Sequence, residues 1–223
     1  MPVSVAIDGP AGAGKSTVAK KAAAVLGFTY VDTGAVYRSV TFFCDRAGVN
    51  KDDDAAVSKA LEGLSADISF KDGAQHVSVN GEDVTDMIRT PKISSLTSFY
   101  AAKPCVRAFL LELQREMARS RDVIMDGRDI GTVVLPDADV KIFLTASPEV
   151  RAKRRYDELR AKGENVSFDD ILSSVNQRDR QDSERSAAPL KQAEDAIYLD
   201  TGDMDIDAAV QRVVDIVRNE VCK

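Results

Sequence analysis

Residues 6–17, AIDGPAGAGKST, decide the fold of this chain. Within them, Gly9 to Ser16 fit the pattern G-x-x-x-x-G-K-[ST] without a mismatch. The glycines can adopt backbone angles that other residues avoid, so successive N–H groups can turn inward and surround phosphate oxygens. The segment follows a short apolar run and precedes a stretch of helical composition, which is the placement that such a loop requires. It therefore predicts a nucleoside triphosphate site.

Two side chains of this loop are expected to do chemistry. Lys15 is expected to bridge the β- and γ-phosphates as a catalytic cation, and the Ser16 hydroxyl to reach a magnesium ion. The residues expected to hold the triphosphate are Gly9, Pro10, Ala11, Gly12, Ala13, Gly14, Lys15, Ser16 and Thr17.

Short apolar runs alternate with helical stretches along the rest of the chain. The runs, at residues 3–7, 28–31, 123–125, 140–144 and 197–199, have the composition of buried parallel strands. Helical stretches include residues 15–26, 107–119, 148–162, 168–182 and 205–221. This order predicts an α/β protein with the P-loop NTPase fold, in which helices flank a central five-stranded parallel sheet.

Residues 60–90 depart from this alternation. Strand-like pieces at 67–70 and 76–79 flank the turn sequence KDG, and the turn sequence NGED follows them. This pattern predicts a small antiparallel patch inserted into the α/β fold.

The composition is that of a globular protein with a negative net charge. The 223 residues are 44% hydrophobic and 30% charged, with a formal net charge of −6. These values argue against disorder and against a general nucleic-acid-binding protein, which normally carries a basic surplus. No apolar run approaches the roughly 18 residues that a membrane span needs. The N-terminus has no basic region followed by an apolar stretch, so we expect a cytoplasmic protein without a membrane partner.

The cysteines and the histidine suggest no metal or catalytic site. Cys44, Cys105 and Cys222 are widely spaced and show no zinc-site pattern, so we expect reduced thiols in a cytosol, most simply as small apolar groups. His76 is the only histidine and lies in an alternating polar stretch, so we expect it at the surface.

Polar segments follow the second and third apolar runs, where ligand sites of open α/β sheets gather. DTGAVYR, residues 32–38, follows the second run, and Asp32 or Thr33 can equally serve as a plain helix N-cap. MDGRDIGTVV, residues 125–134, places Asp126 where a carboxylate orients magnesium, directly or through water. A tight turn with an incidental ion pair is the alternative for this second segment.

A third polar segment, NQRDRQDSERSAAPL at residues 176–190, carries a row of charges. Arg178, Asp182 and Arg185 are spaced i, i+4, i+7, which predicts one helical face. Arginines beside a carboxylate suit a phosphorylated sugar, although salt bridges on a surface helix remain an alternative. With a net negative charge on the whole chain, an anionic ligand must be held by such a local cluster.

Taken together, these motifs resemble those of the bacterial cytidylate kinases. IDGPAGAGKST, DTGAVYR, DGRDIGTVV and RDRQDSERSAAPL occur in the same order and spacing, and the resemblance extends over nearly the whole chain. It implies that Arg38, Arg128 and Arg185 hold the phosphate of the acceptor nucleotide. It also implies that Arg178 and Asp182 face the pentose, and that Ser98, Arg107 and Asp129 contact the cytosine edge. Without the family, Ser98 is equally a helix-surface hydroxyl.

The resemblance also implies a domain organisation and a reaction. Residues 1–223 form one kinase domain with a core at about 1–60, 91–150 and 184–223, a nucleoside-monophosphate-binding insertion at about 60–90 and a lid at about 151–163. The expected reaction is transfer of the γ-phosphoryl group from MgATP to CMP or dCMP, with Arg154 or Arg155 moving onto the transferring group as the lid closes. The alternatives are a kinase for UMP, AMP or another phosphorylated metabolite, or a nucleotide-dependent switch. We expect a monomer.

Overall fold

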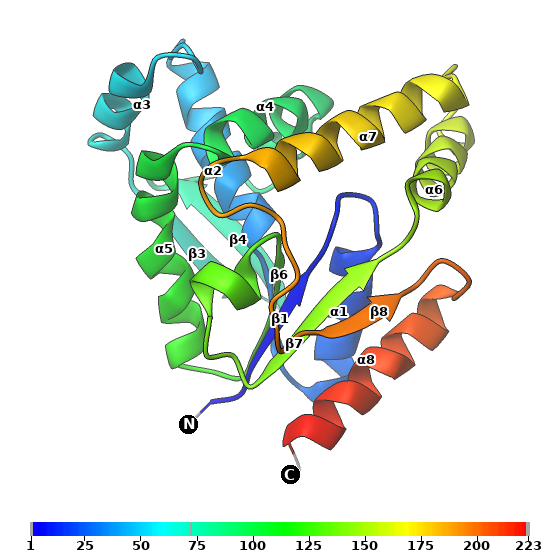
Figure 1. The fold of residues 1–223 in the computed structure, drawn as a ribbon. Helices are drawn as coiled ribbons and strands as arrows, with labels where there is room; N and C mark the ends of the chain where they lie inside the picture. Colours follow the sequence, from blue (N-terminus) through cyan, green and yellow to red (C-terminus); the bar gives the residue numbers. More distant parts are fainter. Residues whose placement is uncertain (1, 72, 222–223) are drawn as a thin grey trace.

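The computed structural model describes residues 2–71 and 73–221. Its centre is a five-stranded sheet in the order β2-β6-β1-β7-β8, in which neighbouring strands pair in parallel. The strands are β1 (Ser4–Asp8), β2 (Thr29–Asp32), β6 (Val123–Gly127), β7 (Val140–Thr145) and β8 (Ile197–Asp200). Each strand overlaps one of the predicted apolar runs, and β1 and β2 begin and end one residue later than predicted, so the predicted parallel sheet is confirmed (Figure 1).

Helices cover both faces of this sheet, because alternate residues of a strand point to opposite faces. Val5 and Ile7 of β1 pack in one layer with α1 (Lys15–Leu26) and α8 (Ile206–Val221). Ala6, between them, packs in the opposite layer, to which α5 (Pro104–Arg119) contributes. Val5 and Ile7 have no exposed surface, as expected for a central parallel strand that is covered on both faces.

A smaller antiparallel sheet, β3-β4-β5, is inserted between the second and third strands of the main sheet along the chain. It consists of β3 (Ala66–Lys71), β4 (Ala74–Val79) and β5 (Glu82–Asp83), and it follows α2 (Thr33–Arg46) and α3 (Asp54–Leu61). Asn80 and Gly81 have φ values of 50° and 82°, so they form the tight turn that their sequence predicts. The predicted antiparallel patch is confirmed. The chain returns through η1 (Met87–Arg89) and α4 (Pro91–Ala101).

The helices α6 (Pro148–Ala161) and α7 (Phe168–Glu184) pack against each other, and α7 extends from α6 towards α2 and α4 (Figure 1). The prediction that Arg178, Asp182 and Arg185 share one helical face is wrong for Arg185, because α7 ends at Glu184 and Arg185 has extended backbone angles. The chain turns back here, since the N–H of Leu190 donates to the carbonyl of Asp182.

The remaining sequence predictions concern the membrane, the thiols and the histidine. Across residues 2–71 and 73–221, every helix is too short or too polar to cross a bilayer. Cys44 is buried and Cys105 is half-buried, and both are free thiols, whereas Cys222 lies outside the described residues. His76 is half-buried, and its Nδ1 lies 2.8 Å from a carboxylate oxygen of Asp83 within the inserted sheet.

Candidate active site

A cavity of about 1070 Å³ lies at the carboxyl ends of β2 and β6, between the phosphate loop, α2, α4 and α7. The cavity is lined by nearly all of the predicted site residues, which come from six separate segments of the chain. Gly9 and Pro10, the first two residues of the loop, are the exceptions, because both are buried and do not line the cavity. The predicted residues that line it are Ala11, Gly12, Ala13, Gly14, Lys15, Ser16, Thr17, Asp32, Thr33, Arg38, Ser98, Arg107, Asp126, Arg128, Asp129, Arg154, Arg155, Arg178, Asp182 and Arg185.

The phosphate loop has the backbone geometry that its glycines predict. Gly12 and Gly14 have φ values of 77° and 89°, which side chains rarely allow. A Cβ on Gly9 would lie 1.9 Å from the carbonyl oxygen of Leu144, so a larger residue cannot fit there. The Lys15 ammonium is buried and donates to the Pro10 carbonyl at 2.7 Å. Burial, reinforced by the charge of Arg128, lowers the pKa of Lys15 well below its usual value.

Asp126, at the end of β6, faces the first turn of α1. Its carboxylate accepts hydrogen bonds from Ser16 Oγ at 2.9 Å and from Tyr30 Oη at 2.8 Å. Its backbone carbonyl accepts from Thr33 Oγ1 at 2.7 Å, so Thr33 fastens the start of α2 to β6. Burial, followed by the nearby charge of Asp32, raises the pKa of Asp126. Tyr30 was not predicted from the sequence, because nothing in its own segment points to a carboxylate on another strand.

Several arginines of the cavity are held by carboxylates but keep unused donors. Asp32 caps α2 by accepting from the N–H of Ala35 at 2.9 Å, and its other oxygen accepts from Arg38 Nη2 at 2.8 Å. Asp182 accepts from Arg128 Nε at 2.8 Å. The Nε atoms of Arg38 and Arg178 are buried and have no partner among the described residues. The cavity therefore offers guanidinium donors without a protein acceptor, as an anion site does.

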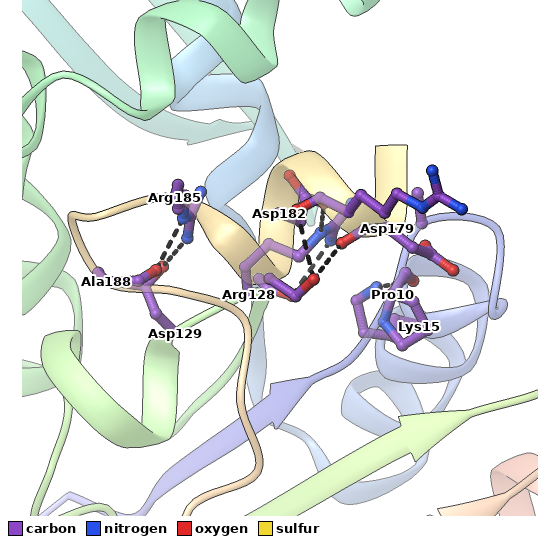
Figure 2. A network of polar contacts seen from close by, with 12 residues as sticks. Pro10, Lys15, Arg128, Asp129, Asp179, Asp182, Arg185 and Ala188 are labelled. Atoms are coloured by element: carbon purple, nitrogen blue, oxygen red, sulfur yellow. Dashed lines mark hydrogen bonds and ion pairs between the residues drawn. The ribbon is translucent and has the colours of Figure 1, made fainter. Parts of the chain in front are cut away.

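The charge of Asp182 is maintained by its neighbours. Burial alone would raise the pKa of this carboxyl, but Arg128 and Arg178 lower it below its usual range. Figure 2 shows Asp182 and Arg128 together between Lys15 on one side and Arg185 on the other. The site thus alternates cations and carboxylates from the phosphate loop to the end of α7.

Asp129 is the centre of the second half of this network. Its carboxylate pairs with Arg107 of α5. It also accepts from Arg185 Nη2 at 3.3 Å, and Arg185 Nε donates to the Ala188 carbonyl at 2.7 Å (Figure 2). Burial raises the pKa of Asp129 even though both guanidinium groups oppose the shift. Ser98 lines the same cavity from α4 and is half-buried.

The arginines of α6 are placed differently from one another. Arg154 Nη2 donates to the Thr201 carbonyl at 2.6 Å, and Arg155 pairs with Glu158 at the surface. The buried Arg151, which the sequence did not single out, donates to the Ala11 carbonyl of the phosphate loop at 3.0 Å and holds Asp179 of α7 with two bonds. Its sequence context, RAKRR, contains no signal that separates it from its neighbours.

Asp8, at the end of β1, is a further buried carboxylate that the sequence analysis did not identify. It accepts from the N–H groups of Ile130 and Gly131, both at 2.8 Å, at the start of the π-helical turn η2 (Ile130–Val134). This contact fixes the segment that carries Arg128 and Asp129. Burial raises the pKa of Asp8 to about 6, against the hydrogen bonds from Gly131 and Ile130.

The raised pKa of Asp8 predicts a pH-dependent stability. Because the folded state holds the proton more tightly than the unfolded state does, the stabilising contribution is complete below about pH 4 and is lost as the pH rises through about 6. We expect wild type to lose up to about 3 kcal/mol of unfolding free energy relative to Asp8→Asn between about pH 4 and pH 7. Urea denaturation of both proteins across this range measures the difference. A flat difference, or one of opposite sign, would contradict the assignment.

The fold and the cavity together define a class of protein. A phosphate loop that opens into a cavity lined by arginines, at the carboxyl edge of a five-stranded parallel sheet, is the arrangement of a P-loop kinase for a small phosphorylated substrate. A crystal structure of an uncharacterized protein from Eubacterium ventriosum has the same fold, with a TM-score of 0.55, 13% identity and coverage of 97% of this chain and 98% of that chain.

The sequence comparisons give the family. The cytidylate kinase family model matches residues 5–219. A cytidylate kinase of Geobacter sulfurreducens is 52% identical, covering 96% of this chain and 92% of its own. One of Thermosipho melanesiensis is 48% identical over 100% of both chains. The chain belongs to the cytidylate kinase family, and the resemblance predicted from its motifs is confirmed.

Proposed function

We propose that this protein transfers the γ-phosphoryl group of ATP to CMP and dCMP, giving ADP and CDP or dCDP. The observation that carries the proposal is one continuous cavity with the phosphate loop on one side and Arg38, Arg128, Arg178 and Arg185 on the other. The family relatives named cytidylate kinase support the nucleotide and the reaction. These relatives do not favour a kinase for another nucleotide. The four arginines also argue against a nucleotide-dependent switch, because a switch needs no site for an acceptor phosphate.

The donor side of the cavity fits ATP with magnesium. Ser16 Oγ and an oxygen of Asp126 lie 2.9 Å apart, and both are the hard oxygen donors that Mg²⁺ prefers. The described residues contain no cluster of three histidine, cysteine or acidic side chains, which fits an ion held mainly by phosphates and water. When bound there, Mg²⁺ neutralises phosphate charge during transfer. Lys15 and the loop amides hold the phosphates in line with the acceptor.

The acceptor side needs positive charge but no base. A phosphate monoester has a second pKa near 6, so at neutral pH its attacking oxygen is already largely ionised. The barrier then includes repulsion between anions, which for two unit charges about 4 Å apart is roughly 1 kcal/mol in water and about 4 kcal/mol at an effective dielectric of ~20. We assign Arg38, Arg128 and Arg185 to the acceptor phosphate, where they offset this repulsion.

The remaining polar side chains are assigned to the nucleoside. Asp182 and Arg178 face the pentose, for which the unpaired Nε of Arg178 is an available donor. Ser98, Arg107 and Asp129 contact the cytosine edge. Cytosine presents an amino donor beside two acceptors, which a carboxylate, a guanidinium and a hydroxyl can match. Uracil reverses part of this hydrogen-bonding pattern, so the same three side chains disfavour it.

We further infer that the protein closes over its substrates and acts as a cytoplasmic monomer. Residues 151–163 form the lid, residues 60–90 form the acceptor-binding insertion, and Arg154 or Arg155 moves onto the transferring group. The free thiols Cys44 and Cys105 suit a reducing compartment. Among the described residues, the large exposed apolar side chains are distributed over α1, η1, α4, β8, the segment between β8 and α8, and α8, which supports a monomer.

A coupled assay of ADP formation with MgATP and a panel of nucleoside monophosphates tests the function. We expect CMP and dCMP to give kcat/KM values at least about tenfold above those of UMP, AMP and GMP. The reaction without an acceptor is the control and should be slower by orders of magnitude. A higher value for UMP or AMP would replace the proposed substrate, and hydrolysis that ignores the acceptor would indicate a switch.

A further inference from the structure

Gln75 of β4 connects the inserted sheet to the edge of the main sheet. Its side-chain oxygen accepts from the backbone N–H of Asp32 at 2.7 Å, and its Nε2 donates to the backbone carbonyl of Asp32 at 3.1 Å. Gln75 itself pairs with Phe70 of β3 in the antiparallel ladder. One amide group therefore satisfies both backbone polar groups of the last residue of β2.

The Gln75 amide supplies hydrogen bonds that a neighbouring strand would otherwise make to the outer edge of β2. β2 is an edge strand, since it pairs with β6 and with no other strand of the five-stranded sheet. In a parallel strand the N–H and C=O of one residue point to the same side, so an edge-strand residue that turns them away from the sheet leaves both unpaired. The Gln75 amide pairs with both groups, as a neighbouring strand would, and it fixes the two peptide groups on either side of the Asp32 Cα.

The orientation of Asp32 in turn fixes Arg38. One Asp32 oxygen caps α2 and the other accepts from Arg38 Nη2 at 2.8 Å, with Arg89 Nη2 at 3.9 Å from the same atom. A Cβ on Gly34 would lie 3.0 Å from Arg38 Nη1 and 3.1 Å from an Asp32 oxygen, so the pair is packed closely over the first turn of α2. The remaining Nε of Arg38 is buried and unpaired among the described residues.

The inserted sheet does not depend on Gln75 for its attachment. Phe70 packs against two apolar clusters, one that contains Val36 of α2 and one that contains Val123 of β6, and the guanidinium of Arg121 lies 5.3 Å from the centre of its ring. Glu82 of β5 also pairs with Arg46 of α2 at 2.7 Å. Removing the Gln75 amide should therefore leave the hairpin in place and affect mainly the local geometry at Asp32.

We propose that Gln75 is a positioning residue that, through Asp32, holds Arg38 in the geometry that receives the acceptor phosphate. The inserted sheet thus controls affinity for the acceptor by a single amide that does not line the cavity. This inference rests on the proposed function, because it takes Arg38 as an acceptor-phosphate ligand.

Steady-state kinetics of Gln75→Ala tests the inference. We expect KM for CMP to rise about tenfold, with KM for ATP and the melting temperature almost unchanged. Gln75→Glu should be at least as impaired, because a carboxylate cannot donate to the Asp32 carbonyl. His76→Ala is the matched control, since the next residue of β4 bonds to Asp83 and not to the main sheet. Equal increases in both KM values would indicate a purely structural role and overturn the proposal.

A double-mutant cycle distinguishes action through Arg38 from action elsewhere. In an Arg38→Met background, Gln75→Ala should change kcat/KM for CMP by less than about twofold, because contacting residues that act together are not additive. A tenfold effect in both backgrounds would overturn the proposal. The failure of the proposed function is separately visible, since wild type would then not favour CMP in the nucleotide panel, whatever the Gln75 variants do.

Discussion

Lys15→Met is expected to lower kcat for phosphoryl transfer by roughly 10³-fold or more, the largest effect of any single substitution considered. Lys15 is 5% exposed, and its ammonium donates to the Pro10 carbonyl inside the phosphate loop, so a bound water cannot supply the charge that the substitution removes. Its pKa is already lowered by burial and by Arg128, and triphosphate oxygens in the loop would favour the charged form again. Methionine keeps the length and volume of the side chain but removes the cation.

The rate is measured as ADP formation at saturating CMP and ATP. Lys20→Met is the matched control, because Lys20 lies on the same helix, is exposed and does not line the cavity. It should retain kcat within about twofold. If Lys15→Met kept more than about a tenth of the wild-type kcat, charge on the transferring phosphates would have to be offset by another residue.

Local sequence patterns predict the elements of this protein well, because the strands are short apolar runs and the loop has a fixed spacing. They do not predict residues whose partners are distant along the chain. Asp8 bonds to residue 130, Tyr30 to residue 126, and Arg151 to residue 11, separations of 122, 96 and 140 residues. Gln75 lies 43 residues from Asp32, on a strand that a pattern search identifies only as part of a hairpin.

For Arg185, a local sequence pattern predicts a secondary structure that the residue does not have. Helical periodicity places it on one face with Arg178 and Asp182, but α7 ends one residue earlier. Arg185 nevertheless lines the cavity with them, because the turn back at Ala188 brings its guanidinium to Asp129. Helical periodicity therefore predicts the correct neighbours of Arg185, although a turn after the helix, and not the helix itself, brings them together.

Arg185→Ala is expected to lower kcat/KM for CMP by roughly 10²-fold or more while the dissociation constant for ATP changes by less than about threefold. The Arg185 side chain is 6% exposed and is held by Asp129 and by the Ala188 carbonyl, so its donors are fixed before any ligand binds. Truncation removes those donors and leaves the buried Asp129 paired with Arg107 alone. Both changes affect the acceptor side, whereas the phosphate loop keeps all of its contacts.

Arg185→Lys separates the loss of charge from the loss of geometry. A lysine restores the positive charge but not the planar array of donors, so kcat/KM should recover only in part. Arg180→Ala is the matched control, because this arginine of α7 is exposed and does not line the cavity. Steady-state kinetics and calorimetric titration with ATP give the two quantities. A loss of ATP affinity with kcat/KM for CMP unchanged would contradict this assignment. It would indicate that Arg185 contacts the triphosphate, because only such a residue can lower the affinity for ATP without affecting the use of CMP.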